Sequence, residues 1–453
     1  MNARLSLAAL ACALAAAGCS FAPKYERPAA PVPAEFPYPG AAQGQPASAL
    51  DWQQFFSDER LKSLITTALA NNRDLRVAIL NIEQARAQYD IRRADRLPTI
   101  GATITETRNP GTSAVYSVGI GASAWEVDLF GRVASLSEVA LAQYLATEEG
   151  RKAAQTSLIA SVATTWLALA ADEELITLTR DTLSTREESL RLTRLRFENG
   201  ASSELDFRQA QSLYESARAT FSQLQRQRAL DIDALGLLVG QVLPRDYQAG
   251  TGTATVSLPD LPAGLPSDVL ARRPDVRQAE QQLVGANANI GAARAAFFPR
   301  ITLTGGIGTA SKDLSDLFSG GWSWTVAPTV VQTIFDAGRN RAGLKSAQAA
   351  RDIAVAQYER AIQSAFREVS DALAGRAFFG EQERAQSGVV DAETARTRLA
   401  RLRYEGGVAS YLDFLDAQRS LFTAQQSLVQ TRLQRLQNQV QLYRALGGGW
   451  TGG

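Results

Sequence analysis

The spacing of apolar and polar residues changes several times along the chain, and each change marks a new element. Residues 58–96 place apolar side chains at helical spacing until Pro98 ends the pattern. Residues 99–127 alternate with a period of two around an Asn-Pro-Gly turn, which predicts a β-hairpin. Residues 131–240 carry a seven-residue apolar repeat without proline, which predicts a long helical hairpin with a coiled-coil seam. The seam positions are Val162, Leu169, Ile176, Leu183, Leu190 and Phe197.

The same order of elements occurs twice, which predicts an internal two-fold repeat. The first copy occupies residues 58–258. The second copy, at 259–448, again has a helical stretch, a β-hairpin at 300–335 and a long helical hairpin at 338–447. A short tail at 449–453 ends the chain. The second seam consists of Leu415, Phe422, Val429, Leu436 and Tyr443.

The turn that ends each helical hairpin is the best preserved part of the repeat. Residues 194–207 and 401–414 match at a constant offset of 207 residues. Gly200 and Gly407 can take the left-handed conformation that ends a helix, and serines follow that can cap the next one. Two such tips predict a function for this part of the molecule. The matching pairs are Arg194/Arg401, Leu195/Leu402, Arg196/Arg403, Glu198/Glu405, Gly200/Gly407, Ser203/Ser410, Leu205/Leu412, Asp206/Asp413 and Phe207/Phe414.

The first residues predict export and lipid attachment. Arg4 precedes an apolar core at 5–17, which is too short to span a bilayer. The core ends in Ala-Gly-Cys, so residues 1–18 resemble a bacterial lipoprotein signal peptide with Cys19 as the acylated N-terminus. An ordinary signal peptide cut near residue 18 is the alternative. The proline-rich residues 19–57 predict an extended segment behind the anchor.

Composition excludes several classes of protein. The 453 residues have a net charge of +1, no His and two Cys. Without His the commonest general base and metal ligand is missing, and the neutral balance gives no sign of a nucleic-acid partner. Acidic residues are spread along helix faces, and the Gly-Gly-Ile-Gly run at 305–308 lies inside a strand pattern. We therefore predict no enzyme, no cofactor, no metal site and no nucleic-acid binding.

The two β-hairpins are built like membrane-spanning strands. Each strand is close to the roughly 9–11 residues that cross a bilayer, but four strands cannot close a barrel when about eight is the minimum. Because open strand edges are not tolerated in lipid, several chains should share one barrel. Three chains would give twelve strands and a real pore. Trp125, Trp322 and Trp324 flank the apolar alternation, so we predict that they lie at the membrane–water boundaries; packing against helices is the alternative.

Several motifs together resemble a known family. They are the Cys-Ser-Phe-Ala-Pro-Lys-Tyr-Glu-Arg-Pro start, Arg-Pro-Asp-Val-Arg at 273–277, the duplicated tip, residues 412–419 and the Ala-Leu-Gly-Gly-Gly-Trp ending at 445–450. Over nearly the whole mature chain the sequence resembles TolC-like outer-membrane efflux proteins of the lipoprotein (OprM-like, NodT) type. The resemblance implies a mixed α and β membrane protein: a homotrimer with a 12-stranded outer-membrane β-barrel on a coiled-coil periplasmic α-barrel.

The resemblance also implies a function and partners. The chain would be the gated exit duct of a tripartite drug efflux pump, anchored in outer-membrane lipid and reaching into the periplasm. Its partners would be a periplasmic adaptor (membrane fusion) protein and an inner-membrane RND transporter. A type I secretion or metal-efflux duct is an alternative, although the lack of His argues against metal handling. A non-conducting coiled-coil scaffold is a further alternative, which the amphipathic β-hairpins disfavour.

The tips are the expected contact and gate. Small residues there let a partner's backbone approach closely, so we predict that the adaptor docks on Gly200, Ala201, Ser202, Gly407, Val408 and Ala409. Asp416 and Arg419 replace Gln209 and Ser212 of the first hairpin and share one helix face. The resemblance implies an aperture closed by acidic, Arg and Tyr side chains. The predicted gate residues are Asp416, Arg419, Tyr404 and Arg403.

Acylation of Cys19 gives the first testable prediction. We expect the intact mass of the purified protein to show a chain that begins at Cys19 and carries acyl groups. Cys19→Ala should weaken anchoring but leave the strands in the membrane. An unmodified chain that begins at another residue would refute the assignment.

Overall fold

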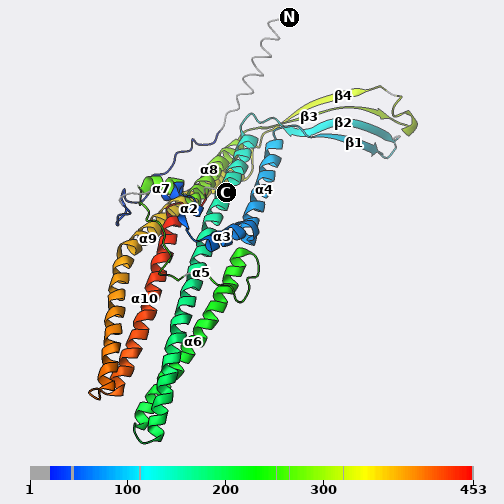
Figure 1. The fold of residues 1–453 in the computed structure, drawn as a ribbon. Helices are drawn as coiled ribbons and strands as arrows, with labels where there is room; N and C mark the ends of the chain where they lie inside the picture. Colours follow the sequence, from blue (N-terminus) through cyan, green and yellow to red (C-terminus); the bar gives the residue numbers. More distant parts are fainter. Residues whose placement is uncertain are drawn as a thin grey trace. The chain divides into compact units, whose positions relative to one another are not determined.

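The structure is a computed structural model that describes residues 21–41, 45–111, 114–250, 252–264, 266–319 and 321–450. Cys19 and the predicted signal peptide lie outside the described residues. Long helices and one β-sheet make up the fold (Figure 1). In chain order the elements are η1 (Ala47–Ala49), α2 (Trp52–Phe55), α3 (Glu59–Asn71), α4 (Arg73–Ala94), β1 (Ile100–Thr107), β2 (Val115–Glu126), α5 (Arg132–Glu198), α6 (Glu204–Val239), α7 (Pro266–Arg272), α8 (Pro274–Ala295), β3 (Arg300–Ser311), η2 (Leu314–Asp316), β4 (Ser323–Val331), α9 (Arg339–Glu405) and α10 (Tyr411–Ala445).

The chain forms two compact units, and each unit takes segments from both halves of the sequence. Of the described residues, the first unit contains those up to Ala30, together with those in Leu80–Gly150 and Arg277–Ala361. The second contains Pro31–Ile79, Arg151–Val276 and Ile362–Gly453. The repeated halves are therefore related in sequence without being separate compact bodies.

The sheet of the first unit is antiparallel throughout, with strand order β1-β2-β3-β4 (Figure 1). The two β-hairpins meet through β2 and β3, where Ile120 lies opposite Ile307. Strands β1 and β4 are the outer strands, and every residue in them is exposed. Each outer strand thus has one edge without a strand partner among the described residues.

The two faces of the sheet differ in chemistry, as the period of two predicts. On one face the side chains are apolar: Ile100, Ala102, Ile104, Val118, Ile120, Ile301, Leu303, Ile307, Val326 and Val330. On the other face they are small or carry hydroxyl groups: Gly101, Thr103, Thr105, Ser117, Gly119, Gly121, Gly306, Gly308 and Thr325. A lipid-facing side and a water-facing side follow from this division.

The tryptophans lie at opposite ends of the apolar face. Trp125 pairs with Leu303 after a bulge in β2, and its indole donates a hydrogen bond to the carbonyl of Arg96 at 3.3 Å. Trp324 pairs with Ile307 near the other end and is 75% exposed. Trp322 is likewise exposed. Placement of the three at membrane boundaries stays a prediction, since Trp125 also contacts the chain beyond α4.

One break in the helices was not predicted. The periodic stretch at 58–96 forms two helices, α3 and α4, that are divided at Asn72. The side-chain oxygen of Asn72 accepts a hydrogen bond from the amide of Leu75 at 2.9 Å, while its NH₂ group donates to the carbonyl of Leu238 at 2.9 Å. Asn72 thus ends α3 and caps the start of α4, so the helix is interrupted here although the sequence has no proline at this position.

The C-terminal end of the chain packs into the core of the second unit. Tyr443 of α10 stacks on Phe55 with ring centroids 4.0 Å apart, and its hydroxyl donates to the carbonyl of Leu50 at 2.7 Å. A Cβ on Gly448 would lie 2.2 Å from the Tyr443 ring, so this position needs glycine. The ending at 445–450 is therefore a packing motif.

The Arg-Pro-Asp-Val-Arg motif has a structural role as well. The Arg273 side chain is only 6% exposed and donates to both carboxylate oxygens of Asp275 and to Glu368 of α9 at 2.8 Å. It also donates to the carbonyl of Ala445 at 3.0 Å. One buried guanidinium thus joins the start of α8 to α9 and to the end of α10. Removing one member of such a buried network is strongly destabilising.

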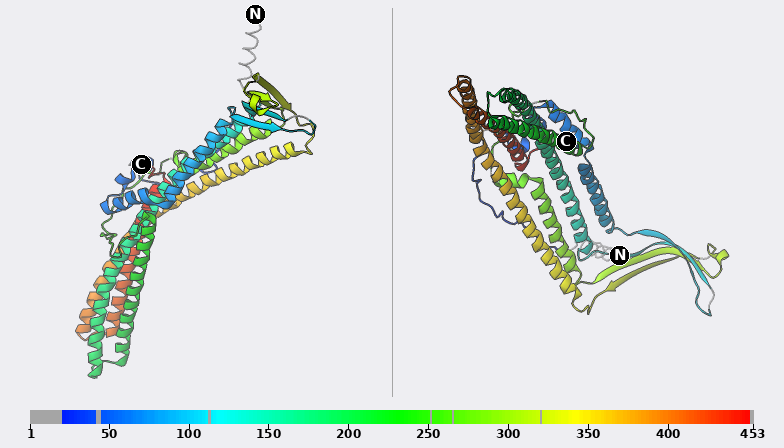
Figure 2. Two further views of the ribbon diagram at one scale, coloured as in Figure 1. Left: turned by 90° about the vertical axis from the view of Figure 1, so that its right-hand side faces the viewer. Right: turned by 90° about the horizontal axis from the view of Figure 1, so that it is seen from below.

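The helical hairpins of the second unit pack along the predicted seams. Figures 1 and 2 show α6 returning beside α5 and α10 returning beside α9. Val162, Leu169 and Ile176 of the first seam are buried, whereas Phe197 near the tip is exposed. Among the described residues, α5 contains the one window apolar enough to cross a membrane, and 61% of that window is buried in the protein. It serves as a core helix.

A buried carboxyl group on α5, Asp172, with Asp231 of α6 nearby, predicts a pH effect on stability. Burial, followed by the negative charge of Asp231, raises the pKa of Asp172 to about 7. A carboxyl whose pKa is raised on folding contributes stability below its unfolded value of about 4 and loses it as the pH rises through 7. Asp172→Asn should therefore stabilise the protein at pH 8 by roughly 2 kcal/mol and have little effect at pH 4.

Thermal unfolding at pH 4 and pH 8 would measure this effect. Asp233→Asn, at an exposed position on α6, is the control and should give no gain at either pH. A gain of Asp172→Asn that is the same at both pH values would contradict the prediction.

Candidate functional site at the hairpin tips

Both tips end their first helix in the same way. Gly200 has φ of +72°, its amide donates to the carbonyl of Phe197 at 2.9 Å, and the amide of Ala201 donates to Arg196 at 2.7 Å. Gly407 also has φ of +72°, and the same two hydrogen bonds recur in the second hairpin. This Schellman motif satisfies the last carbonyls of each helix and needs glycine at the left-handed position.

The return helices begin with matching caps. Ser203 and Ser410 each accept a hydrogen bond from the amide three residues on, and Asp206 and Asp413 complete the capping boxes. Each box satisfies amide groups that the start of a helix leaves unpaired. The two aspartates therefore hold the turns in shape.

The predicted docking residues form an open surface at each tip. A Cβ on Gly200 or Gly407 would meet no atom within 4 Å. Val408 is 71% exposed, and exposed leucines, Leu205 and Leu412, follow in the two tips. Each tip therefore presents a small-residue turn beside an apolar side chain that the described chain does not cover.

Tyr404 connects the two hairpins. In the first hairpin Phe197 stacks on Phe207 with ring centroids 5.7 Å apart. In the second hairpin Tyr404 takes the place of Phe197, and its hydroxyl accepts a hydrogen bond from the guanidinium of Arg196. The same guanidinium lies over the Tyr404 ring, 5.8 Å from its centroid. The added hydroxyl group makes a polar link that a phenylalanine cannot make.

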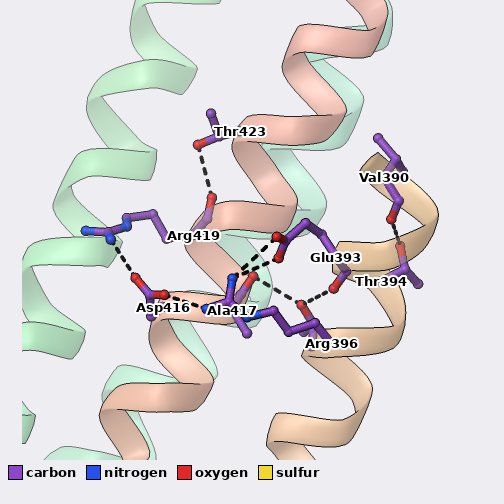
Figure 3. Close-up of polar contacts among 9 residues, drawn as sticks. Val390, Glu393, Thr394, Arg396, Asp416, Ala417, Arg419 and Thr423 are labelled. Atoms are coloured by element: carbon purple, nitrogen blue, oxygen red, sulfur yellow. Dashed lines mark hydrogen bonds and ion pairs between the residues drawn. The ribbon is translucent and has the colours of Figure 1, made fainter. Parts of the chain in front are cut away.

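Asp416 is the centre of a charged cluster in the second hairpin (Figure 3). Its carboxylate is 2.5 Å from the Arg419 guanidinium on α10 and 2.6 Å from the Arg396 guanidinium on α9. Arg396 also pairs with Glu393 at 3.1 Å. The hydrogen bond from Arg396, together with the nearby charge of Arg419, lowers the pKa of Asp416. The cluster ties the two helices of this hairpin together.

Arg396 and Glu393 were missed by the sequence analysis. At the offset of 207 residues they correspond to Ser189 and Arg186 of the first hairpin. Arg186 is buried there and donates to a backbone carbonyl, that of Leu213, at 2.9 Å. Extending the comparison of the two hairpins from α10 to α9 would have found the extra arginine.

The predicted gate residues fall into two groups. Asp416 and Arg419 are paired directly, and Arg403 lines the same groove of about 590 Å³ as Asp416 and Arg396. Tyr404 belongs instead to the contact with Arg196. The second hairpin therefore carries one charged cluster within itself and one link to the first hairpin.

Comparison with known proteins identifies the family. The profile of the outer membrane efflux protein family matches the chain twice, over residues 64–241 and 265–448. The chain belongs to this family. It is 47% identical to the antibiotic efflux pump outer membrane protein ArpC of Pseudomonas putida, with 98% of this chain and 95% of ArpC covered. It is 44% identical to the outer membrane protein OprJ of Pseudomonas aeruginosa, with 99% and 96% covered.

Solved structures agree with this assignment. The open state of the MtrE outer membrane channel of Neisseria gonorrhoeae is 41% identical, with a TM-score of 0.89 over 95% of this chain and 99% of MtrE. The outer membrane efflux protein described here thus has the protomer fold of the trimeric, TolC-like outer-membrane channels, with four strands per chain and a long helical periplasmic part. The family is one of efflux channels, which disagrees with a non-conducting scaffold.

The open tips yield a testable prediction. Gly200→Leu combined with Gly407→Leu places two large side chains where a partner would approach, and the positive φ adds roughly 1–2 kcal/mol of strain at each turn. We expect loss of drug resistance in cells while trimers still assemble, as judged by cross-linking. Gly388→Leu is the control, because this helical glycine of α9 also has open space around it. Full resistance in the double variant would exclude the tips as the contact.

Proposed function

We propose that three copies of this outer membrane efflux protein form the exit duct of a tripartite drug efflux pump, closed at its periplasmic tip until a periplasmic adaptor docks. The adaptor would connect the duct to an inner-membrane RND transporter. The relative named as part of an antibiotic efflux pump supports drugs as cargo.

The bare strand edges support the trimer. Strands β1 and β4 are exposed along their whole length, and a backbone edge in lipid leaves amide and carbonyl groups unpaired at several kcal/mol each. Pairing β4 of one copy with β1 of the next removes every such edge. Closure at three copies gives a barrel of twelve strands with the hydroxyl-rich face toward the lumen.

The charged cluster around Asp416 is the main observation in support of a gate in the second hairpin. Threefold symmetry near an axis would bring three Asp416 carboxylates together, and like charges at short distance repel. Each Asp416 carboxylate already has two arginine guanidinium groups within 2.6 Å. The negative charge of a closed ring would therefore be neutralised by arginines of the same chain. The first hairpin has Gln209 and Ser212 at the matching positions and cannot form this ring.

The Tyr404–Arg196 contact supports a way to open the gate. It holds the second hairpin against the first, next to the tip where the adaptor would dock. A partner that inserts beside Gly200 and Gly407 competes for the space around this contact. Release of Tyr404 then frees the second hairpin, with Arg403 and Asp416, to move outward.

We further infer a passive duct that carries out no catalysis and uses no cofactor. At the candidate site the acidic side chains already have structural partners: Asp206 and Asp413 cap helices, and Asp416 and Glu393 pair with arginines. Acylation of Cys19 remains part of the proposal.

Single-channel conductance tests the gate. Asp416→Ala with Arg396→Ala and Arg419→Ala should raise the conductance of purified trimers several-fold and admit large antibiotics into cells. Glu381→Ala with Arg384→Ala is the matched control, because it removes an exposed pair at 2.6 Å on the same helix α9. Equal conductance of the triple variant and the control, in assembled trimers, would place the gate elsewhere. Tyr404→Phe tests the contact between Tyr404 and Arg196 by itself, because it removes only the hydroxyl group that accepts the hydrogen bond.

A further inference from the structure

The contact between the two helical hairpins changes in kind along α5. Away from the tips, Ala171 and Leu175 of α5 form an apolar cluster with Val429 of α10. Closer to the tips, Arg186 lies over the Phe422 ring of α10, with 5.1 Å between the guanidinium carbon and the ring centroid. An apolar contact is thus followed by a contact between a cation and an aromatic ring.

Arg186 is a buried cation without a carboxylate partner. The residue is 4% exposed, and no carboxylate of the described residues pairs with its guanidinium. One terminal nitrogen donates to the carbonyl of Leu213 on α6 at 2.9 Å, whereas the Nε hydrogen has no acceptor in the described part of the chain. Burial lowers the pKa of this guanidinium, because the charged form loses its water there. The closed hairpins therefore hold a charge that the protein compensates only in part.

Neither member of this contact is repeated in the other hairpin. At the offset of 207 residues Arg186 corresponds to Glu393, which pairs with an arginine of its own hairpin. Phe422 corresponds to Glu215, which also pairs with an arginine of its own hairpin. The contact is therefore a second asymmetric feature of the repeat, beside the charged cluster of the gate.

Cavities flank this contact on both sides. Toward the apolar cluster, a cavity of about 580 Å³ is lined by Leu178 of α5 and Gln425 of α10, among others. Toward the tips, a cavity of about 610 Å³ is lined by Ser189 of α5 and Gln418 of α10, among others. Polar cavities of this size have room for many water molecules. Water therefore reaches the contact from either side as soon as the hairpins begin to part.

A contact between an arginine and an aromatic ring separates more easily than an apolar contact. When two apolar side chains part in water, both lose the free energy of burial. When Arg186 parts from Phe422, the ring loses burial, but the guanidinium regains the water that it lost on closing. This hydration offsets the lost attraction between cation and ring. We therefore expect the apolar cluster at Val429 to stay closed while the contact at Arg186 opens.

We propose that Arg186 is a positioning residue of the gate, whose buried charge keeps the two hairpins separable as far as Phe422. The second hairpin then swings from the apolar cluster at Val429. This rests on the proposed opening of the second hairpin. Thr423 and Leu412 lie six and seventeen residues from Val429 along α10. These separations are about 9 and about 26 Å at roughly 1.5 Å per residue, so a rigid swing moves Thr423 about a third as far as Leu412.

Distances between spin labels test where the hairpins separate. Leu205→Cys with Leu412→Cys reports the tips, and Glu187→Cys with Thr423→Cys reports the level of Arg186. All four labelled positions are exposed. The labelled chains lack native cysteines, are exported behind an unrelated signal peptide and assemble with an excess of unlabelled chains. Each trimer then carries labels on one chain.

Arg196→Ala with Tyr404→Phe releases the contact at the tips in all chains of the trimer. In this variant we expect a separated population in which the distance at the level of Arg186 grows about a third as much as the distance at the tips. Adding Arg186→Met should reduce that population about tenfold, because methionine has a similar length and no charge to hydrate. Adding Arg186→Lys, which keeps the charge, should preserve it.

Arg180→Met is the matched control on the same helix. Arg180 lies over Phe221 of its own hairpin at 5.8 Å, so its replacement should leave the separated population unchanged. If Arg186 only stabilised the closed hairpins, Arg186→Met would enlarge the separated population instead. An enlarged or unchanged population in Arg186→Met trimers would overturn the proposal. So would the absence of a separated population, or tips that part while the distance at the level of Arg186 stays constant.

The conductance of the Asp416 variant reports the gate separately. Distances that change as expected, together with an unchanged conductance of that variant, contradict the proposed gate and leave the role of Arg186 supported. Failure of the gate and failure of this inference are therefore distinguishable.

Discussion

The constraint on which this molecule depends is the need to pair every strand edge in a membrane. One chain supplies a sheet of four strands whose apolar face suits lipid, yet β1 and β4 each keep one bare edge. Several copies resolve this when the outer strands of neighbouring chains pair with one another. Within the second unit, the buried Arg273 joins the start of α8 to α9 and to the end of α10.

The internal repeat gives two nearly equal hairpins, and the proposed gate rests on the few residues that differ between them. The Schellman turns and capping boxes are the same in both tips, so the backbone geometry there is shared. Asp416, Arg396 and Arg419 are charged only in the second hairpin, and Tyr404 carries a hydroxyl group that Phe197 lacks. The two tips thus share one backbone scaffold, and only the second hairpin adds the charged cluster and the tyrosine hydroxyl group on which the proposed gate rests.

The N-terminal segment at residues 21–27 is held by side chains of one helix, α8. An extended segment with prolines makes no regular backbone ladder, so its position depends on side chains of α8. Asn287 and Arg294 bind its carbonyl groups, while Glu280 holds Arg27.

The sequence by itself determined the local features. The alternation of apolar and polar residues determined the two faces of the strands, and the seven-residue apolar repeat determined the seams of the helical hairpins. Glycine followed by serine determined the turn at each tip. Each of these features depends on residues only a few positions apart in the sequence. Only the tertiary structure decided what depends on distant partners. The break at Asn72 uses the carbonyl of Leu238, the partner of Tyr404 is Arg196, and Asp416 is shared with Arg396 on another helix. A periodic pattern does not reveal these contacts, since it records which face a side chain takes and not which residue lies opposite.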